Sequence, residues 1–367
     1  MQFEISRETL IKPLQLVTGV VERRQTLPVL SNVLLVLEGD ELSMTGTDLE
    51  VELVGRVQVA PGADGGEVTV PARKLMDICK SLPDDAEMKF SLDDNKLVIR
   101  SGRSRFSLST LPPSDFPSVD GSAESLEFKV SQQRLKDMLD STSFAMAQQD
   151  VRYYLNGMLF EVSPNYLRVV SSDGHRLAMD TEDMNTQADK ELQVIVPRKG
   201  ILELARLLAE GSDDVLVAIG ANHIRATTAN FTFTSKLVDG KFPDLERILP
   251  KGGDKKLLGD RDQLRQSLNR TAILSNEKFR GIRLILNKDE IKILANNPEQ
   301  EEAEETVAVE YDGNSFEIGF NVSYLVDVLS VLDTKTVQLV MSDPNSSALI
   351  QGDDGSSALY VVMPMRL

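Results

Sequence analysis

The chain has 367 residues, more than one hydrophobic core usually organises, and its apolar fraction of 41% is ample for packing two or three domains. A formal net charge of -17 disfavours a nucleic-acid or anionic-membrane partner if the charges are evenly spread. The single cysteine, Cys79, excludes an internal disulfide, and the N-terminal MQFEISRETL is neither a signal peptide nor a membrane span. A cytoplasmic protein without a membrane partner is therefore expected.

One pattern of predicted elements occurs three times along the chain. Each copy begins with a short extended run and then a helix capped by Ser6, Ser131 or Asp260, because these side-chain oxygens can accept from free backbone N–H groups. Strand–turn–strand segments with alternating apolar and polar residues follow at 30–48, 154–173 and 279–297. A second helix comes after each of them. The six predicted helices lie at 6–20, 71–82, 131–145, 197–208, 261–275 and 321–332.

Two candidate linkers rich in proline, glycine and charge separate the three copies. They lie at 111–125 and 249–256, which predicts domains at 1–125, 126–253 and 254–367. Each domain would hold two helices backed by antiparallel β-sheets, an α+β fold. Repeats of this size are whole domains, and their head-to-tail repetition either continues as a filament or closes into a ring.

Positive charge is concentrated in the predicted helices. Together the six carry a net charge of +6, so the rest of the chain carries -23. One explanation is that lysine and arginine are good helix formers. The other is a basic surface lined by helices that faces a polyanion, while the acidic remainder repels it elsewhere. Two of the six helices, 131–145 and 321–332, have no net positive charge.

A glutamate-rich segment in the third domain has a basic counterpart in the first. The segment ANNPEQEEAEETV (295–307) is strongly acidic, whereas VIRSGRSRFSLSTL (98–111) is typical of an edge strand that carries arginine. In a head-to-tail dimer the two would face each other and fix the orientation of the chains. A solvated acidic face is the alternative. The residues predicted at this dimer interface are Lys74, Arg103, Arg105, Phe106, Leu108, Ile273, Leu274, Glu299, Gln300, Glu301, Glu304 and Glu305.

Long segments in order along the whole chain resemble one known family. They include MTGTDLEVEL (44–53), VPARKLMDICKSLP (70–83), SDGHRLA (172–178), AILSNEKFRGIRL (272–284) and YVVMPMRL (360–367). The chain is similar to the bacterial DNA polymerase III β subunit, the sliding clamp. The resemblance implies a DNA-clamp fold, in which outer sheets and an inner ring of helices close as a head-to-tail homodimer around duplex DNA. Twelve helices would leave a bore of about 28 Å, wide enough for the duplex.

The resemblance also implies partners and contact residues. An ATP-driven clamp loader would place the ring on primed DNA, and the polymerase III α subunit, other polymerases and repair proteins would bind it through short peptides. Phosphate contacts without sequence specificity are expected at Arg24, Arg73, Gln149, Tyr153, Tyr154, Arg198 and Lys199. The pocket for partner peptides is expected at Arg152, Tyr154, Leu155, Ser172, Gly174, His175, Arg176, Leu177, Pro243, Arg247, Ile248, Asn321, Tyr324, Ser347, Val361, Val362, Met363, Pro364, Met365, Arg366 and Leu367.

The C-terminal segment itself favours such a groove. Pro364 cannot donate a sheet hydrogen bond, so the last strand is expected to end near Met363. Met363, Met365 and Leu367 would then line a surface groove, and methionine repacks readily around different partners.

An enzymatic function is weighed against these interpretations. Ser171, Asp173 and His175 are close in sequence, but a catalytic triad is defined by geometry, and a structural turn or pocket wall is the stronger interpretation. The sequence holds no P-loop and no cluster with metal-ligand spacing, so no catalytic residue, cofactor or metal is expected. His223 is interpreted as an exposed turn or strand residue. The competing function is an acidic scaffold that binds proteins only, and a hydrolase at His175 is a remote third.

Overall fold

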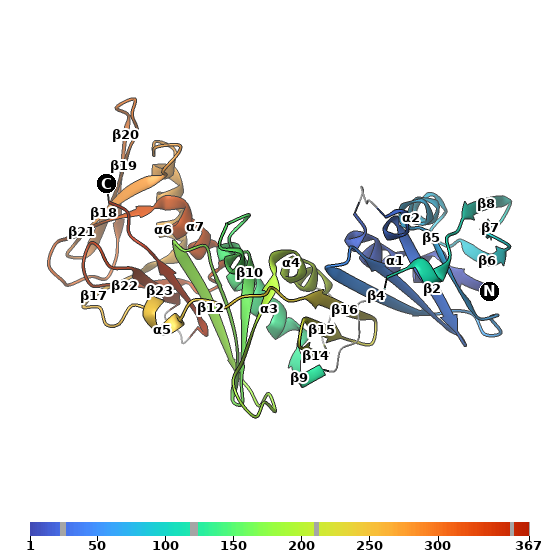
Figure 1. Cartoon of the computed structure of the whole chain (residues 1–367). Helices are drawn as coiled ribbons and strands as arrows, with labels where there is room; N and C mark the ends of the chain where they lie inside the picture. Colours follow the sequence, from blue (N-terminus) through green and yellow to red (C-terminus); the bar gives the residue numbers. More distant parts are fainter. Residues whose placement is uncertain (23–26, 118–123, 209–212, 353–355, 367) are drawn as a thin grey trace. The chain divides into compact units, whose positions relative to one another are not determined.

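The computed structural model describes residues 1–22, 27–117, 124–208, 213–352 and 356–366 (Figure 1). Within these residues the chain forms seven α-helices: α1 (Arg7–Val20), α2 (Ala72–Ser81), α3 (Gln132–Thr142), α4 (Arg198–Leu207), α5 (Leu245–Ile248), α6 (Arg261–Ala272) and α7 (Val322–Val331). Six of them match the predicted helices. The short α5 was not predicted, because a single turn leaves no periodic pattern in the sequence.

The described chain divides into two compact units, and the first comprises residues 1–133 and 202–237. It contains an antiparallel eight-stranded sheet with the order β5 (Gly66–Pro71), β2 (Asn32–Glu38), β3 (Glu41–Thr47), β4 (Val51–Gln58), β16 (Phe231–Lys236), β15 (His223–Thr227), β14 (Asp214–Gly220) and β9 (Glu124–Ser131). Its four-stranded sheet has the order β1 (Gln2–Ser6), β6 (Glu87–Asp93), β7 (Lys96–Ser101) and β8 (Ser104–Ser109).

The second unit comprises residues 134–201 and 238–367, described except at 353–355 and 367. Its eight-stranded sheet has the order β13 (Leu192–Pro197), β10 (Gly157–Ser163), β11 (Tyr166–Ser172), β12 (Arg176–Asp183), β24 (Ala358–Val362), β23 (Ala348–Gly352), β22 (Thr336–Met341) and β17 (Lys255–Asp260). Its four-stranded sheet has the order β20 (Glu302–Ala308), β19 (Glu290–Asn296), β18 (Gly281–Asn287) and β21 (Phe316–Asn321).

Each eight-stranded sheet joins strands from two of the predicted repeats. In the first unit β4 pairs with β16, and in the second unit β12 pairs with β24, both antiparallel. These long-range pairings cross the boundaries expected at 125 and 253. The division into three domains therefore stays a prediction, although the predicted hairpins within each repeat are present as β2–β3, β10–β11 and β18–β19.

The helix starts follow from the predicted caps. The Ser6 hydroxyl accepts a hydrogen bond from the Thr9 backbone N–H, and the Asp260 carboxylate accepts one from Gln263. Each cap satisfies one of the free N–H groups that a helix leaves at its first turn. Pro13 lies inside α1, and the helix continues through it to Val20.

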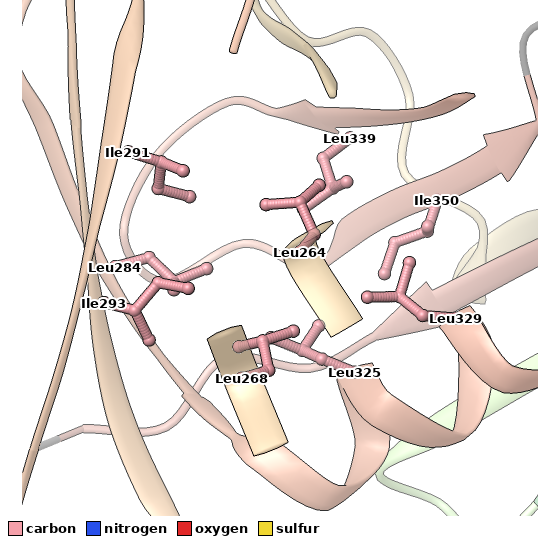
Figure 2. Close-up of a pocket in the computed structure, with 9 residues that line it drawn as sticks. All are labelled: Leu264, Leu268, Leu284, Ile291, Ile293, Leu325, Leu329, Leu339 and Ile350. Carbon is pink, nitrogen blue, oxygen red and sulfur yellow. The ribbon is translucent and has the colours of Figure 1, made fainter. Parts of the chain in front are cut away.

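The C-terminal core of the second unit lies between helices and both sheets. Leu264 and Leu268 of α6 pack toward Leu325 and Leu329 of α7, beside strands β18 and β19 (Figure 2). The nine apolar side chains shown there enclose a cavity of about 20 Å³. A cavity of this size without polar lining stays dry, so it represents slightly incomplete packing.

Candidate functional site

A pocket of about 80 Å³ gathers residues from distant parts of the second unit. Its walls come from the η4 turn (Tyr153–Leu155), the β11–β12 connection, the segment that leads into α5 and the C-terminal end of β24. The lining residues are Arg152, Tyr154, Leu155, Ser172, Gly174, Arg176, Leu177, Pro243, Ile248, Val361 and Met363. All eleven were predicted for the partner-peptide pocket, so the structure brings these predicted residues together.

The β11–β12 turn forms one wall through side-chain bonds to its own backbone. Asp173 Oδ1 accepts from the N–H groups of His175 and Arg176, at 2.9 and 3.0 Å. Ser172 Oγ accepts from Gly174 N–H and donates to the Arg176 carbonyl. Gly174 has a φ of 87°, in the left-handed region where glycine is favoured. The turn is therefore held by Asp173 and Ser172 as structural groups.

Arg152 covers the rim of the pocket at this turn. Its guanidinium binds both carboxylate oxygens of Asp150 and donates to the Asp173 carbonyl at 3.1 Å. A Cβ on Gly174 would lie 2.6 Å from Arg152 Nη1, so only glycine allows this approach. The hydrogen bond from Arg152 lowers the pKa of Asp150 to about 2, which keeps that carboxylate ionised even in mildly acidic solution.

Arg176 fixes a second wall by linking β12 to α7. Its guanidinium lies 4.6 Å from the centre of the Tyr324 ring and 5.1 Å from that of Phe144. It also donates to the carboxylates of Asp173 and Asp327. Two aromatic faces and two carboxylates leave this side chain little freedom. Asp327 was not predicted here, although a single charge on an apolar helix was a signal that it has a partner.

The inner surface of the pocket is apolar. Leu155, Leu177 and Val361 are buried and belong to one core cluster of the second unit. Met363 is 40% exposed, and its N–H donates to the His175 carbonyl, so the chain turns out of β24 at the pocket edge. The site thus combines an apolar floor, the flexible thioether side chain of Met363 and an arginine rim. Such a surface suits a short peptide with large apolar side chains.

The other predicted pocket residues lie outside this lining. Val362 belongs to a different core cluster from Val361, because successive residues of a strand face opposite sides, so it does not line this pocket. His175 stacks on Tyr324, with ring centres 6.3 Å apart, and Arg247 is exposed beside Asp244. Leu367 lies outside the described residues. The remaining ones that do not line the pocket are Asn321, Tyr324, Ser347, Pro364, Met365 and Arg366.

The geometry of Ser171, Asp173 and His175 does not form a triad. Ser171 is buried and its hydroxyl donates to the Thr142 carbonyl. Asp173 bonds to backbone N–H groups and to Arg176, and the His175 ring stacks on Tyr324. A triad needs the base within hydrogen-bond reach of the nucleophile. The interpretation as a structural turn and pocket wall is therefore confirmed by the hydrogen bonds.

The described residues that were predicted to contact DNA are divided between the two units. Arg73 is exposed on α2 in the first unit, and Arg24 lies outside the described residues. In the second unit, Arg198 and Lys199 are the first two residues of α4. The Arg198 guanidinium donates to the Met146 carbonyl at 3.3 Å. Gln149 has a φ of 56° in an exposed loop, and the Tyr153 and Tyr154 rings meet edge to face. Their role at DNA stays a prediction.

Five of the twelve residues predicted at the dimer interface lie on two edge strands, β8 and β20. Among the described residues, β8 has a strand neighbour only in β7, and β20 has one only in β19. β8 carries Arg105 and follows Arg103, both exposed, and Lys74 is exposed on α2. Ile273 follows α6 and is 75% exposed, and Leu274 is half-buried. Glu299, Gln300 and Glu301 lie in the β19–β20 connection.

Some of these residues already have partners inside their own unit. Leu108 is buried opposite Leu97 in the four-stranded sheet, because it and the half-buried Phe106 face inward; Leu108 is thus no open docking surface. Glu305 binds Arg270 at 2.6 Å, which lowers the pKa of the glutamate, and Glu304 lies 3.5 Å from Lys292. The acidic strand is therefore partly neutralised within the chain.

The prediction that His223 is exposed was wrong. It lies on β15, an interior strand of an eight-stranded sheet, and is almost fully buried. Its ring packs directly over Gly220, where a side chain would collide with it. An alternating pattern in the sequence cannot tell whether the second face of a strand is also covered.

Two features are absent from the described residues. None of their helices is long and apolar enough to cross a membrane. Within the same residues, no three histidine, cysteine, aspartate or glutamate side chains gather in a group that could hold a metal ion.

Comparison with known proteins identifies the family. Models of the DNA polymerase III beta subunit match its N-terminal domain at residues 1–120, its central domain at 129–244 and its C-terminal domain at 246–366. The beta sliding clamp of Pseudomonas aeruginosa is 64% identical and that of Escherichia coli K12 is 52% identical, each over 100% of both chains. A crystal structure of the P. aeruginosa sliding clamp bound to griselimycin superposes with a TM-score of 0.98, at 64% identity and 100% coverage of both chains.

The match in sequence and fold extends over the whole chain and includes the turn and pocket described above. The relatives are DNA polymerase sliding clamps, processivity factors without catalytic residues of their own. The chain therefore belongs to the DNA polymerase III beta subunit family and has the fold and the processivity role of a sliding clamp.

Proposed function

We propose that two copies of this chain close head to tail around duplex DNA and hold polymerases on it by topology. An ATP-driven clamp loader would open and place the ring, in the cytoplasm. The observation that carries the proposal is the pair of complementary edges, basic β8 in the first unit and acidic β20 in the second. Head-to-tail contact uses two different surfaces, so two copies can close a ring that leaves neither edge open.

Backbone chemistry supports pairing between these edges. An edge strand presents a row of N–H and C=O groups that readily accepts another strand. Arg103 and Arg105 would then approach Glu301 and Glu304 of a second copy, and like edges would repel each other. Opposite charges steer the correct orientation more than they add affinity. Exposed Ile273 beside α6 would supply apolar contact at the same seam.

Charge distribution supports DNA in the bore. The net charge of -17 opposes binding on the outer surface, whereas the predicted helices are net basic. Arg73, Arg198 and Lys199 at the starts of helices would touch phosphates without reading bases. Weak contacts of this kind allow sliding, so retention would depend on ring closure.

Retention on circular and linear DNA tests the proposal. The dimer is loaded on nicked circular plasmid by a clamp loader at moderate salt, and bound protein is measured before and after one restriction cut. Topological binding predicts stable retention on circles and rapid loss from the cut molecules, with weak, salt-sensitive binding to a short duplex. Equal loss from circles and linear DNA would overturn the ring, and absence of any DNA retention would favour the acidic protein scaffold.

We also propose that the pocket at Leu177 and Met363 binds the short peptides of polymerases, repair proteins and the loader. Calorimetry with the C-terminal peptide of a polymerase tests this. Met363→Ala removes a side chain that lines the pocket, and Met365→Ala is a matched control on the same tail outside the lining. Weaker binding in the first variant alone supports the pocket. Equal affinity in both variants contradicts it. Griselimycin, found on the P. aeruginosa clamp, is proposed as a ligand of this chain too.

A further inference from the structure

The methionines of the chain differ sharply in their exposure. All twelve lie within the described residues, and eight of them are buried, each at most 8% exposed. Met1, Met184 and Met365 are half-buried. Met363 is the one exposed methionine of the twelve, at 40%, and it is also the one that lines the peptide pocket. The most accessible thioether of the chain therefore lies at the proposed binding site.

The backbone is fixed on both sides of the Met363 side chain. The Met363 N–H donates to the His175 carbonyl in the β11–β12 turn at 2.9 Å. Two residues later, the Met365 N–H donates to the Gly319 carbonyl of β21 at 2.8 Å. Pro364 between them has a restricted φ angle. A chemical change at the Met363 sulfur therefore stays at the pocket edge, because the backbone is held on either side of it.

The single thiol of the chain offers no competing target for an oxidant. Cys79 lies in α2 and is fully buried, and burial raises the pKa of its thiol to about 11. Peroxides react with the thiolate form of cysteine, which is scarce at neutral pH when the pKa is so high. A thioether reacts without losing a proton, so its accessibility decides its rate. Oxidation of this chain at sulfur is therefore expected at exposed methionine first.

We propose that Met363 is a modification site, at which oxidation by hydrogen peroxide to methionine sulfoxide switches off peptide binding in the pocket. In this step a lone pair of the Met363 sulfur attacks one peroxide oxygen, the O–O bond breaks and an S–O bond forms. The sulfur is oxidised by two electrons, and the second peroxide oxygen leaves as water after proton transfer. The inference rests on the peptide pocket of the proposed function, and it does not depend on ring closure or on DNA.

The added oxygen conflicts with the apolar floor of the pocket. Leu155, Leu177 and Val361 offer a sulfoxide no hydrogen-bond donor from their side chains, and a bound peptide would exclude water from it.

The two arginines of the pocket are already committed. The Arg152 guanidinium binds Asp150, and that of Arg176 binds Asp173 and Asp327. The oxidised side chain would therefore keep its hydrogen bonds only by staying in water, and peptide binding should weaken about tenfold or more. Methionine sulfoxide reductases reverse the change, because two thiols of the reductant form a disulfide and the oxygen leaves as water.

Graded oxidation followed by calorimetry tests the proposal. The full chain is treated with hydrogen peroxide, catalase stops the reaction, and peptide mapping by mass spectrometry identifies the oxidised residues. A methionine-free C-terminal peptide of a polymerase is then titrated into the protein. We expect Met363 to be oxidised first, the affinity to fall about tenfold as its sulfoxide accumulates, and the two methionine sulfoxide reductases with a dithiol to restore it. The midpoint of thermal unfolding should stay unchanged, because the modified side chain lies at the surface.

Two matched variants locate the effect at one sulfur. Met363→Leu removes the sulfur and keeps an apolar side chain, so the ratio of its affinities before and after peroxide should be close to one, whatever its starting affinity. Met365→Leu is the control on the same tail, outside the pocket lining, and should keep the tenfold loss.

A protection experiment needs no variant. Saturating peptide added before the peroxide should slow oxidation of Met363, because the peptide covers its thioether. Oxidation of another methionine before Met363, unchanged affinity once Met363 is oxidised, the same tenfold loss in Met363→Leu, or no protection by the peptide would each overturn the inference. Failure of the untreated chain to bind the peptide would overturn the proposed pocket as well, whereas equal binding before and after oxidation of Met363 overturns this inference alone.

Discussion

Ile273 offers a sharp test of ring closure. Its side chain is 75% exposed in the single chain, so Ile273→Ala should leave the fold of its unit unchanged. Full burial of such a side chain contributes about 1.5–3 kcal/mol of free energy. Because three quarters of the Ile273 side chain is still exposed in the single chain, about three quarters of that free energy can be gained at the interface. A closed ring contains two seams, so the total loss is about 2–4.5 kcal/mol per dimer, which corresponds to a dissociation constant raised about 50-fold to 2,000-fold.

Sedimentation across a concentration series measures this constant directly. Phe279→Ala is the control, since Phe279 is also apolar, 55% exposed and in the same unit, but was not predicted at the interface. Leu274 is left unchanged because it is half-buried within its own unit. A dimer of unaltered affinity in Ile273→Ala, with an identical unfolding midpoint, would place the interface elsewhere. Equal weakening by both variants would point to general loss of apolar surface.

Three further changes follow from local geometry. Gly174→Ala should lower the free energy of unfolding of its unit by about 1 kcal/mol in chemical denaturation, because alanine is strained at a left-handed position. It should also weaken peptide binding, because the added Cβ displaces the Arg152 guanidinium at the rim. Leu49→Gly, at the matching turn of the first unit, should stabilise that unit instead. Leu268→Ala enlarges the 20 Å³ cavity and should cost about 0.5 kcal/mol more than Leu14→Ala, which removes a fully buried leucine of α1, as measured by local hydrogen exchange. The lowered pKa of Asp150 means that its ion pair persists from pH 7 to pH 4 and is lost as the pH falls through about 2, which carboxyl chemical shifts would report; a midpoint near the ordinary value would contradict this.

The sequence predicted the helices and hairpins well, because both depend on local periodicity. It could not predict that β4 pairs with β16 or β12 with β24, since alternating strands do not encode their distant neighbours. The same limit explains His223, whose strand proved to be interior. The pocket residues came from family resemblance. Asp327, which holds Arg176, became visible only when distant segments met, whereas Asp150, which holds Arg152, is only two residues away and no sequence pattern marked it.

The repeats act as internal controls that separate structural from functional residues. Asp48 Oδ1 accepts from the N–H groups of Glu50 and Val51, just as Asp173 Oδ1 accepts from those of His175 and Arg176. Thr47 takes the place of Ser172. In both turns the side-chain hydroxyl accepts from the backbone N–H two residues later and donates to the backbone carbonyl four residues later.

A turn that recurs without histidine is a property of the repeated fold, and this is why a serine, aspartate and histidine in sequence gave no active site. What differs between the copies is the left-handed residue, Leu49 at a φ of 78° and Gly174 at 87°. Only the glycine leaves space for the Arg152 guanidinium to cross the turn, at the position where the pocket forms. Because the two turns share one backbone conformation, function is to be sought where their matched residues differ. Exchanging Leu49 and Gly174 would move the backbone strain from one turn to the other, but it would not create a pocket at the first turn.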